Sequence, residues 1–221
     1  VFTTDISRLH NVVTAKLTQP VQDASLAQNI PAAYRDLNNH WFGLTTRARI
    51  IYASKTWVKN GEVTSYEDLA DPKWRGRICT RSGTHFYMLA LTAAYLNHHS
   101  EADTSNWLKA VKANLAHKPQ GNDRAQVKAI WAAECDFSLG NTYYTGQMLA
   151  NFEQQDWANS VSIEFPVFES AGKHVNVSGM AMTKSASNRA DSTALMTYLS
   201  SPTAQEIYGS DNYEYPIALG T

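Results

Sequence analysis

Strand-like and helix-like segments alternate through the middle of this chain, which restricts the folds open to it. The run 41–53 is apolar and rich in β-branched residues, as expected for a long strand that crosses the protein. The further elements predicted in this region are a strand at 77–81, helices at 83–98, 104–116 and 123–133, and a strand at 135–139. Strands separated by helices are typical of a layered α/β architecture with crossover connections.

The composition excludes several classes of protein. With 221 residues, 43% of them hydrophobic, the chain has enough apolar surface for one large domain or two lobes. Its 19 Lys and Arg residues nearly balance 20 Asp and Glu residues, and no basic stripe alternates with aromatic residues. We therefore expect no nucleic-acid partner. No apolar run is long enough to cross a membrane.

Two adjacent tyrosines, Tyr143 and Tyr144, stand where the apolar run 135–139 gives way to a helical pattern. Phenol oxygens are hard donors, and the backbone N–H groups at a helix start attract anions. This combination suits a trivalent cation held together with an anion. Adjacent tyrosines are also common in ordinary protein cores, so the pair alone leaves both interpretations open.

Three strand-to-helix junctions carry small or polar residues, at 81–84, 120–123 and 140–142. Backbone N–H groups exposed at such junctions bind anions, and several of them facing one crevice would form a composite anion pocket. The simpler interpretation is that Ser82, Asp123 and Thr142 only cap helices. The anion-binding candidates from this region are Ser82, Gly83, Asn122 and Asn141.

Other side chains are candidates for the same crevice. Tyr87 is expected within the first turn or so of its helix, where its ring would point toward the Ser82 amide; a core tyrosine is the alternative. Arg47 and Arg81 offer guanidinium groups that would neutralise a bound anion, although surface ion pairs are the usual role of such residues.

Motifs of catalysis are absent from the sequence. It contains no nucleophile elbow, HExxH, P-loop or GxGxxG pattern, and no histidine and acid are spaced to complete a triad with Ser82. We therefore expect a protein that is not an enzyme. Cys79 and Cys135 lie outside any CxxC or Cys/His cluster, and the count of two fits either one disulfide or two free thiols.

Four segments together resemble a known family, the periplasmic ferric-ion-binding proteins of bacterial ABC importers. They are Asp71-Pro-Lys-Trp-Arg-Gly-Arg77, Cys79-Thr-Arg-Ser-Gly-Thr84, Lys118-Pro-Gln-Gly-Asn-Asp-Arg-Ala125 and Gly140-Asn-Thr-Tyr-Tyr144. The order and spacing of these segments and the double tyrosine are similar to that family along nearly the whole chain.

The resemblance implies a type II periplasmic binding-protein fold, with two α/β lobes joined by hinge strands and a ligand cleft between them. It further implies that Fe³⁺ is bound and delivered to an ABC transporter permease, by a monomer in the periplasm or anchored by lipid on the extracellular face. By similarity, Tyr143 and Tyr144 are paired phenolate ligands. Tyr87 is the third tyrosine of the subgroup that binds iron with carbonate or a similar synergistic anion, and Arg47 steadies that anion.

The resemblance also implies an organisation into lobes. Residues 1–46 and 170–221 would form the first lobe, which we expect to be incomplete because family members extend beyond both ends of this chain. Residues 47–169 would form the second lobe, where a Cys79–Cys135 disulfide would brace the ligand-bearing loops if their strands are neighbours.

Two rival hypotheses remain. The first is a binding protein of the same fold for a small organic or phosphate-like anion, in which the tyrosines only line the cleft. The second is an α/β enzyme acting on a phosphorylated or carboxylated small molecule, whose turnover would be lost on Ser82→Ala. A visible tyrosinate-to-iron absorption band would distinguish the ferric-iron hypothesis from the first rival.

Overall fold

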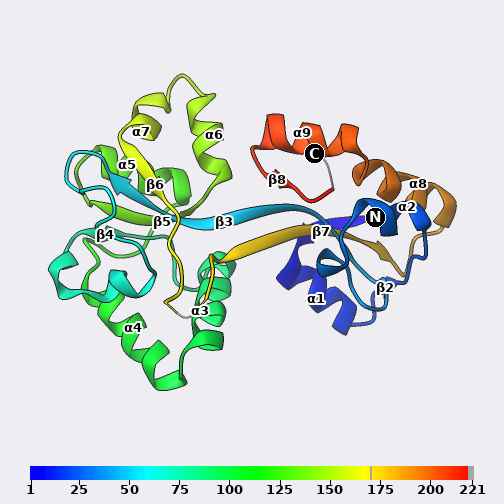
Figure 1. Ribbon diagram of the computed structural model, residues 1–221, viewed down its shortest axis with the longest axis horizontal. Helices are drawn as coiled ribbons and strands as arrows, with labels where there is room; N and C mark the ends of the chain where they lie inside the picture. Colours follow the sequence, from blue (N-terminus) through cyan, green and yellow to red (C-terminus); the bar gives the residue numbers. More distant parts are fainter. Residues whose placement is uncertain (170, 219–221) are drawn as a thin grey trace. The chain divides into compact units, whose positions relative to one another are not determined.

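The structure, a computed structural model, describes residues 1–169 and 171–218 of the chain (Figure 1). The chain divides into two compact units. The first unit is Val1–Arg47 with Val175–Thr221, and the second unit is Ala48–His174. The chain therefore enters the second unit within strand β3 and leaves it where strand β7 begins.

Each unit is built from both helices and strands. The first unit contains β1 (Phe2–Asp5), α1 (Ile6–Thr14), β2 (Thr18–Gln19), α2 (Ala24–Asn29), η1 (Ala32–Tyr34), the start of β3 (Phe42–Ser54), β7 (Val175–Thr183), α8 (Arg189–Leu199), α9 (Pro202–Asn212) and β8 (Tyr215–Pro216). The second unit contains the rest of β3, η2 (Glu67–Ala70), η3 (Pro72–Trp74), β4 (Ile78–Cys79), α3 (Phe86–His98), α4 (Glu101–Ala113), α5 (Asp123–Trp131), β5 (Phe137–Asn141), α6 (Tyr143–Leu149), α7 (Gln155–Asn159) and β6 (Val161–Glu164).

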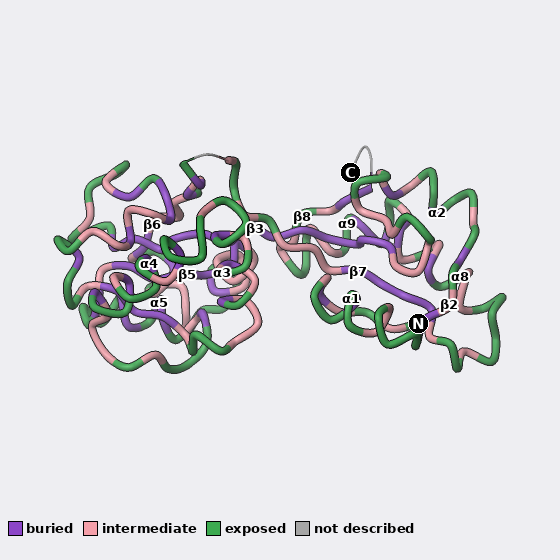
Figure 2. The backbone as a smooth tube through the Cα atoms, turned by 90° about the horizontal axis from the view of Figure 1, so that it is seen from below, coloured by how far each residue is buried: buried purple, intermediate pink, exposed green. Residues whose placement is uncertain are grey.

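Strand β3 is the long strand predicted at 41–53. All 13 of its residues are buried, as the continuous buried colour along β3 in Figure 2 shows. A strand that is covered on both faces has a nearly unbroken run of apolar residues in its sequence, instead of an alternation of apolar and polar residues. Two charged residues interrupt this run, Arg47 and Arg49, and both are buried. Buried charges require partners, so these arginines point to an internal polar site.

The sheet of the second unit has the strand order β6-β3-β5-β4. Strand β3 is antiparallel to β5 and to β6, and β4 is parallel to β5. Parallel strands need a long crossover connection, which here contains α3, α4 and α5. The predicted α/β alternation with crossovers is confirmed in this unit.

Helices cover both faces of this sheet (Figure 1). Side chains alternate between the two faces along each strand, so each strand contributes residues to two separate cores. Ile51 packs with residues of α3 and α4, such as Leu91 and Trp107, in one core cluster. Ile50, its neighbour in the chain, packs with residues of α5 and α6, such as Val127, in a second cluster. The result is a three-layer arrangement of helices, sheet and helices.

Strand β7 is the main strand of the first unit. It pairs antiparallel with β1 from Phe2↔Ala181 to Asp5↔Ser178, and its end pairs with β2. Strand β8 pairs with the first half of β3. Apolar residues from these strands and from α2 and α8 form one core: Val21, Leu26, Ile30, Phe42, Leu44, Met180, Met182, Met196 and Ile217.

The structure differs from the sequence prediction at the two crossings between units. The predicted boundaries followed residue 46 and preceded residue 170, which itself lies outside the described residues. The compact units instead divide after Arg47 and before Val175. The return segment stays with the second unit because Phe168 belongs to its core and the Arg49 N–H donates to the His174 carbonyl at 3.0 Å.

The helical pattern that begins at the tyrosine pair forms two short helices, α6 and α7. Asn151 ends the first helix by local hydrogen bonding: its side-chain oxygen accepts from the Glu153 N–H at 3.0 Å. Asparagine side chains compete with helical hydrogen bonds in this way. Within the described residues, no helix is both long enough and apolar enough to span a membrane.

Gly140 allows strand β5 to pack closely against Tyr52, and its replacement is a test of this packing. A Cβ atom at position 140 would lie 2.8 Å from Tyr52 Cδ2 and closer still to Cε2. We therefore expect Gly140→Ala to lower the free energy of unfolding by about 1–3 kcal/mol through overpacking, measured by urea denaturation. Gly172→Ala is the control, because nothing lies within 4 Å of a Cβ atom there. Equal stability of the two variants would contradict the prediction.

Candidate metal centre

Tyr143 and Tyr144 are the first two residues of α6, directly after β5 ends at Asn141. Tyr52 supports this junction from the neighbouring strand, since its hydroxyl donates to the Asn141 carbonyl at 2.8 Å. Thr142 occupies the N-cap position but makes no side-chain cap hydrogen bond. The simple capping role considered for Thr142 is therefore wrong.

Tyr87 is the second residue of α3, and the start of this helix differs from the prediction. The helix begins at Phe86 instead of Gly83, because the His85 side chain caps it by accepting from the Tyr87 N–H at 3.2 Å. Ser82 and Gly83 lie in an exposed turn before the helix, closed by a hydrogen bond from the His85 N–H to the Ser82 carbonyl. Ser82 is therefore not the cap of α3, and its amide is not part of that helix terminus.

The three candidate tyrosines meet although their segments are far apart in the sequence. The Tyr87 and Tyr143 hydroxyl oxygens lie 3.1 Å apart, and the rings of Tyr143 and Tyr144 have centroids 4.2 Å apart. The loop after β4 and the loop after β5 come together because β4 and β5 are adjacent parallel strands. The second unit thus places three phenols in one cluster.

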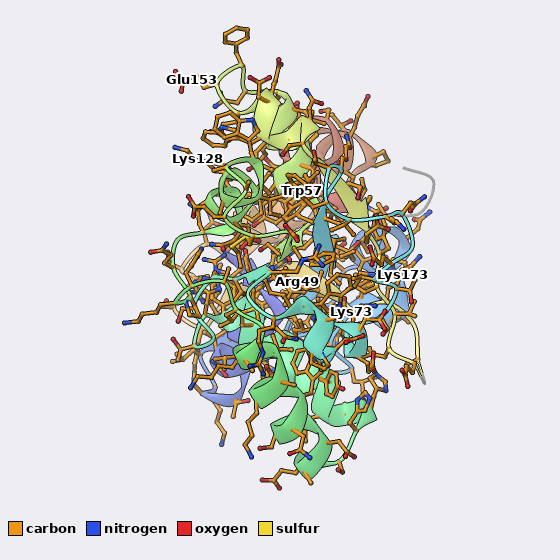
Figure 3. The ribbon with its side chains drawn as sticks, turned by 90° about the vertical axis from the view of Figure 1, so that its left-hand side faces the viewer. Arg49, Trp57, Lys73, Lys128, Glu153 and Lys173 are labelled. Carbon is orange, nitrogen blue, oxygen red and sulfur yellow. A yellow bond between two sulfur atoms is a disulfide. The ribbon has the colours of Figure 1, made fainter. Side chains whose placement is uncertain are left out.

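Asp123 is a fully buried carboxylate in the same unit. It accepts hydrogen bonds from Arg49 Nη1 at 3.2 Å and from Arg81 Nη1 at 2.9 Å. It also accepts from the Asn141 N–H at 3.2 Å. These contacts connect the first residue of α5 with β3, with the segment just after β4 and with the last residue of β5. Figure 3 shows Arg49 in the middle of the view, whereas Lys128 and Glu153 project outward.

The guanidinium groups lie against the tyrosine rings. Arg49 Cζ is 5.8 Å and Arg81 Cζ is 5.3 Å from the centre of the Tyr87 ring. Arg124 Cζ is 5.4 Å from the centre of the Tyr144 ring. Cations in contact with an aromatic face are attracted to its quadrupole, so these contacts orient both the arginines and the phenols.

Burial keeps two of the phenols protonated in the absence of a metal. Desolvation raises the pKa of Tyr143 far above its ordinary value, and its contacts with Tyr144 and Tyr87 raise that pKa further. Desolvation also raises the pKa of Tyr144, although its hydrogen bond with Tyr143 acts in the opposite direction. A cation that binds the phenolate forms must displace these protons, so its affinity rises with pH and falls on acidification.

Several buried hydrogen-bond donors of this region have no partner among the described residues. They are the Nε atoms of Arg49, Arg81 and Arg124 and the Nδ2 atom of Asn141. Native proteins leave few buried donors unpaired, so these atoms are candidates for binding a ligand. Their chemistry, guanidinium and amide N–H, matches an anion.

The remaining residues that the sequence suggested for anion binding or capping lie at different places in the structure. Asn122 caps α5 by accepting from the Ala125 N–H at 3.0 Å, so the capping role considered for Asp123 is wrong. Arg47 belongs to the first unit, where its Nη1 donates to Ser178 Oγ. Sequence reasoning did not single out Arg49. The sequence feature that could have identified Arg49 is its position as a charged residue inside an apolar strand pattern.

A disulfide joins Cys79 in β4 to Cys135, which lies just before β5. The sequence had left this pairing open. Cys79 is two residues before Arg81, and Cys135 is six residues before Asn141. The disulfide therefore connects the two strands that lead to the arginine and tyrosine cluster.

The chain matches a protein-family model over residues 4–219, described as bacterial extracellular solute-binding protein. This chain belongs to that family. The solute-binding proteins of this family are a transport-related group, which agrees with the expectation of a protein that is not an enzyme. The match covers both compact units.

Several proteins that are similar to this chain are named as iron-uptake or ferric-ion-binding proteins. Iron uptake protein A1 of Synechocystis sp. is 40% identical over 220 residues, which are 99% of this chain and 61% of that protein. The solved structure of Pasteurella haemolytica apo ferric ion-binding protein A has a TM-score of 0.95 and 46% identity, and the match covers 99% of this chain and 69% of that one. A Trichodesmium protein in complex with iron and citrate has a TM-score of 0.92 and 38% identity, covering 99% and 70%.

These similarities confirm two predictions from the sequence. The chain is similar to ferric-ion-binding solute-binding proteins, as its motifs indicated, and it has their type II binding-protein fold. This solute-binding protein spans about three fifths of the length of iron uptake protein A1. The roles of its individual residues are addressed below as proposals.

Proposed function

We propose that this solute-binding protein binds ferric iron as a transport substrate through the phenolate oxygens of Tyr87, Tyr143 and Tyr144, together with an anion. The observation that carries the proposal is the cluster of three tyrosines, with the Tyr87 and Tyr143 hydroxyl oxygens 3.1 Å apart. The ferric-ion-binding relatives are consistent with it.

The chemistry of the cluster fits a hard trivalent cation. Oxygen donors without sulfur suit hard metals, and three phenolates would cancel the charge of Fe³⁺. Because the pKa values of Tyr143 and Tyr144 are raised, binding releases protons and acid favours release of the iron.

The anion is carbonate or a similar synergistic anion, held by the donors around the cluster. The unpaired Nε of Arg81 and Nδ2 of Asn141 support this role, and Ser82, Gly83 and Asn122 remain candidates. Arg47, which lies in the first unit, remains a predicted anion ligand. A neighbour that holds citrate with its iron shows that a relative takes an organic anion.

The proposal also includes transport: the protein acts as a monomer in the periplasm and delivers the ferric iron to the permease of an ABC importer. Its support is the family, whose members are extracellular solute-binding proteins. The lipid-anchored location on the extracellular face is the alternative form of the same proposal.

A second candidate function is binding of a small organic or phosphate-like anion without iron. The unpaired buried donors favour it, because Arg49, Arg81 and Asn141 offer N–H groups that an anion alone would satisfy. In this case the tyrosines would only pack beside the arginines.

Titration with ferric nitrilotriacetate, with and without bicarbonate, separates the two functions. We expect a visible charge-transfer band that saturates at an equimolar ratio of iron to protein, requires bicarbonate and is accompanied by release of protons. A protein that stays colourless while calorimetry detects binding of citrate or phosphate would contradict iron binding and support the second function.

A further inference from the structure

Asp123 has a position that neither helix capping nor packing explains. Its carboxylate is fully buried, and Asn122 already caps α5. Removing a carboxylate from water costs free energy that only close partners offset. Its partners are Arg49, Arg81 and the Asn141 N–H, and these are the groups that surround the tyrosine cluster.

The charges around Asp123 do not cancel. Its single negative charge faces two guanidinium groups, which leaves an excess of one positive charge beside Tyr87. Both guanidinium groups keep an unpaired Nε atom. An anion that approaches these atoms is attracted by the arginines and repelled by the carboxylate, so Asp123 competes with it for the same positive charge.

We propose that Asp123 is a positioning residue that makes anion binding depend on iron. It holds Arg49 and Arg81 against the Tyr87 ring and neutralises part of their charge, so an anion is held weakly until a trivalent cation arrives. The contribution of Asp123 is thus a lower affinity for the anion, which the positive charge of the bound metal offsets. This inference rests on the proposed function.

The test is Asp123→Asn, which keeps the shape and one acceptor oxygen and removes the charge. We expect the iron-free variant to bind bicarbonate about tenfold more tightly than the parent by calorimetry. Asp123→Glu, which restores the charge, should bring the bicarbonate affinity back toward that of the parent.

A control and a second variant exclude a purely structural role. Asp136→Asn removes a half-buried carboxylate paired with Arg77 in the same unit, and we expect it to leave bicarbonate binding unchanged. If Asp123→Asn does not fold, Asp123→Ser is the second neutral variant, and we expect it too to bind bicarbonate more tightly than the parent. Bicarbonate affinity that is unchanged or weaker in the folded neutral variant would overturn the inference.

The two proposals fail in different ways. Absence of any iron band from the parent protein would remove the proposed function. The calorimetric comparison of iron-free proteins still tests Asp123, because tighter bicarbonate binding by Asp123→Asn would support its charge-neutralising role, and equal binding would contradict it.

Discussion

Replacement of Tyr143 and Tyr144 by phenylalanine is expected to abolish the visible band and to weaken ferric-iron binding by at least about 100-fold. Phenylalanine retains the ring that packs at 4.2 Å in this pair and removes only the hydroxyl. The loss is therefore one of ligand oxygens and negative charge, with little change in packing. Each single variant should keep a weaker band.

The matched control for these variants is Tyr198→Phe. This tyrosine is 52% exposed on α8 in the first unit and belongs to none of the clusters described above. Its iron titration should be the same as that of the parent. Parental affinity and colour in the double variant, with unfolding midpoints unchanged, would show that these phenols do not bind the metal.

Removal of the disulfide, by Cys79→Ser with Cys135→Ser, is expected to lower the free energy of unfolding by about 4 kcal/mol. The sequence separation of 56 residues closes a long loop, and cross-linking such a loop restricts the unfolded chain. The variant should also bind iron more weakly, because Cys79 and Cys135 connect the segments that carry Arg81 and Asn141.

Urea denaturation of oxidised parent, reduced parent and the double-serine variant measures this effect. Reduction of the parent should reproduce the stability of the variant, because the chain contains only these two cysteines. A reduced parent as stable as the oxidised one would show that β4 and β5 hold together without the disulfide.

Local patterns predicted most elements of the second unit but misplaced their ends. Strand β3 and helices α3, α4 and α5 lie within a few residues of the predicted ranges. The start of α3 was wrong because His85, instead of Ser82, supplies the cap. Which polar residue caps a helix depends on where the preceding turn closes, and several candidates stood side by side in 82–85.

Local sequence patterns also identified only some of the residues at the site. Tyr143 and Tyr144 were identified at a helix start, because that is a property of the local sequence. Arg49 was not identified as a site residue, and Asp123 was considered only as a cap. Their contact at 3.2 Å joins positions 74 residues apart, and nothing in either local segment specifies it.

The sequence by itself determined the α/β alternation, the long buried strand and the tyrosine pair, since each depends on residues close together in the chain. It also indicated the family, through the order and spacing of four short segments. Only the tertiary structure decided that Tyr87 lies beside Tyr143, that Asp123 binds two arginines and that Cys79 pairs with Cys135. These contacts follow from the parallel pairing of β4 with β5 and the antiparallel pairing of β3 with β5. Strand pairing depends on packing across the whole unit, so local sequence patterns do not reveal it.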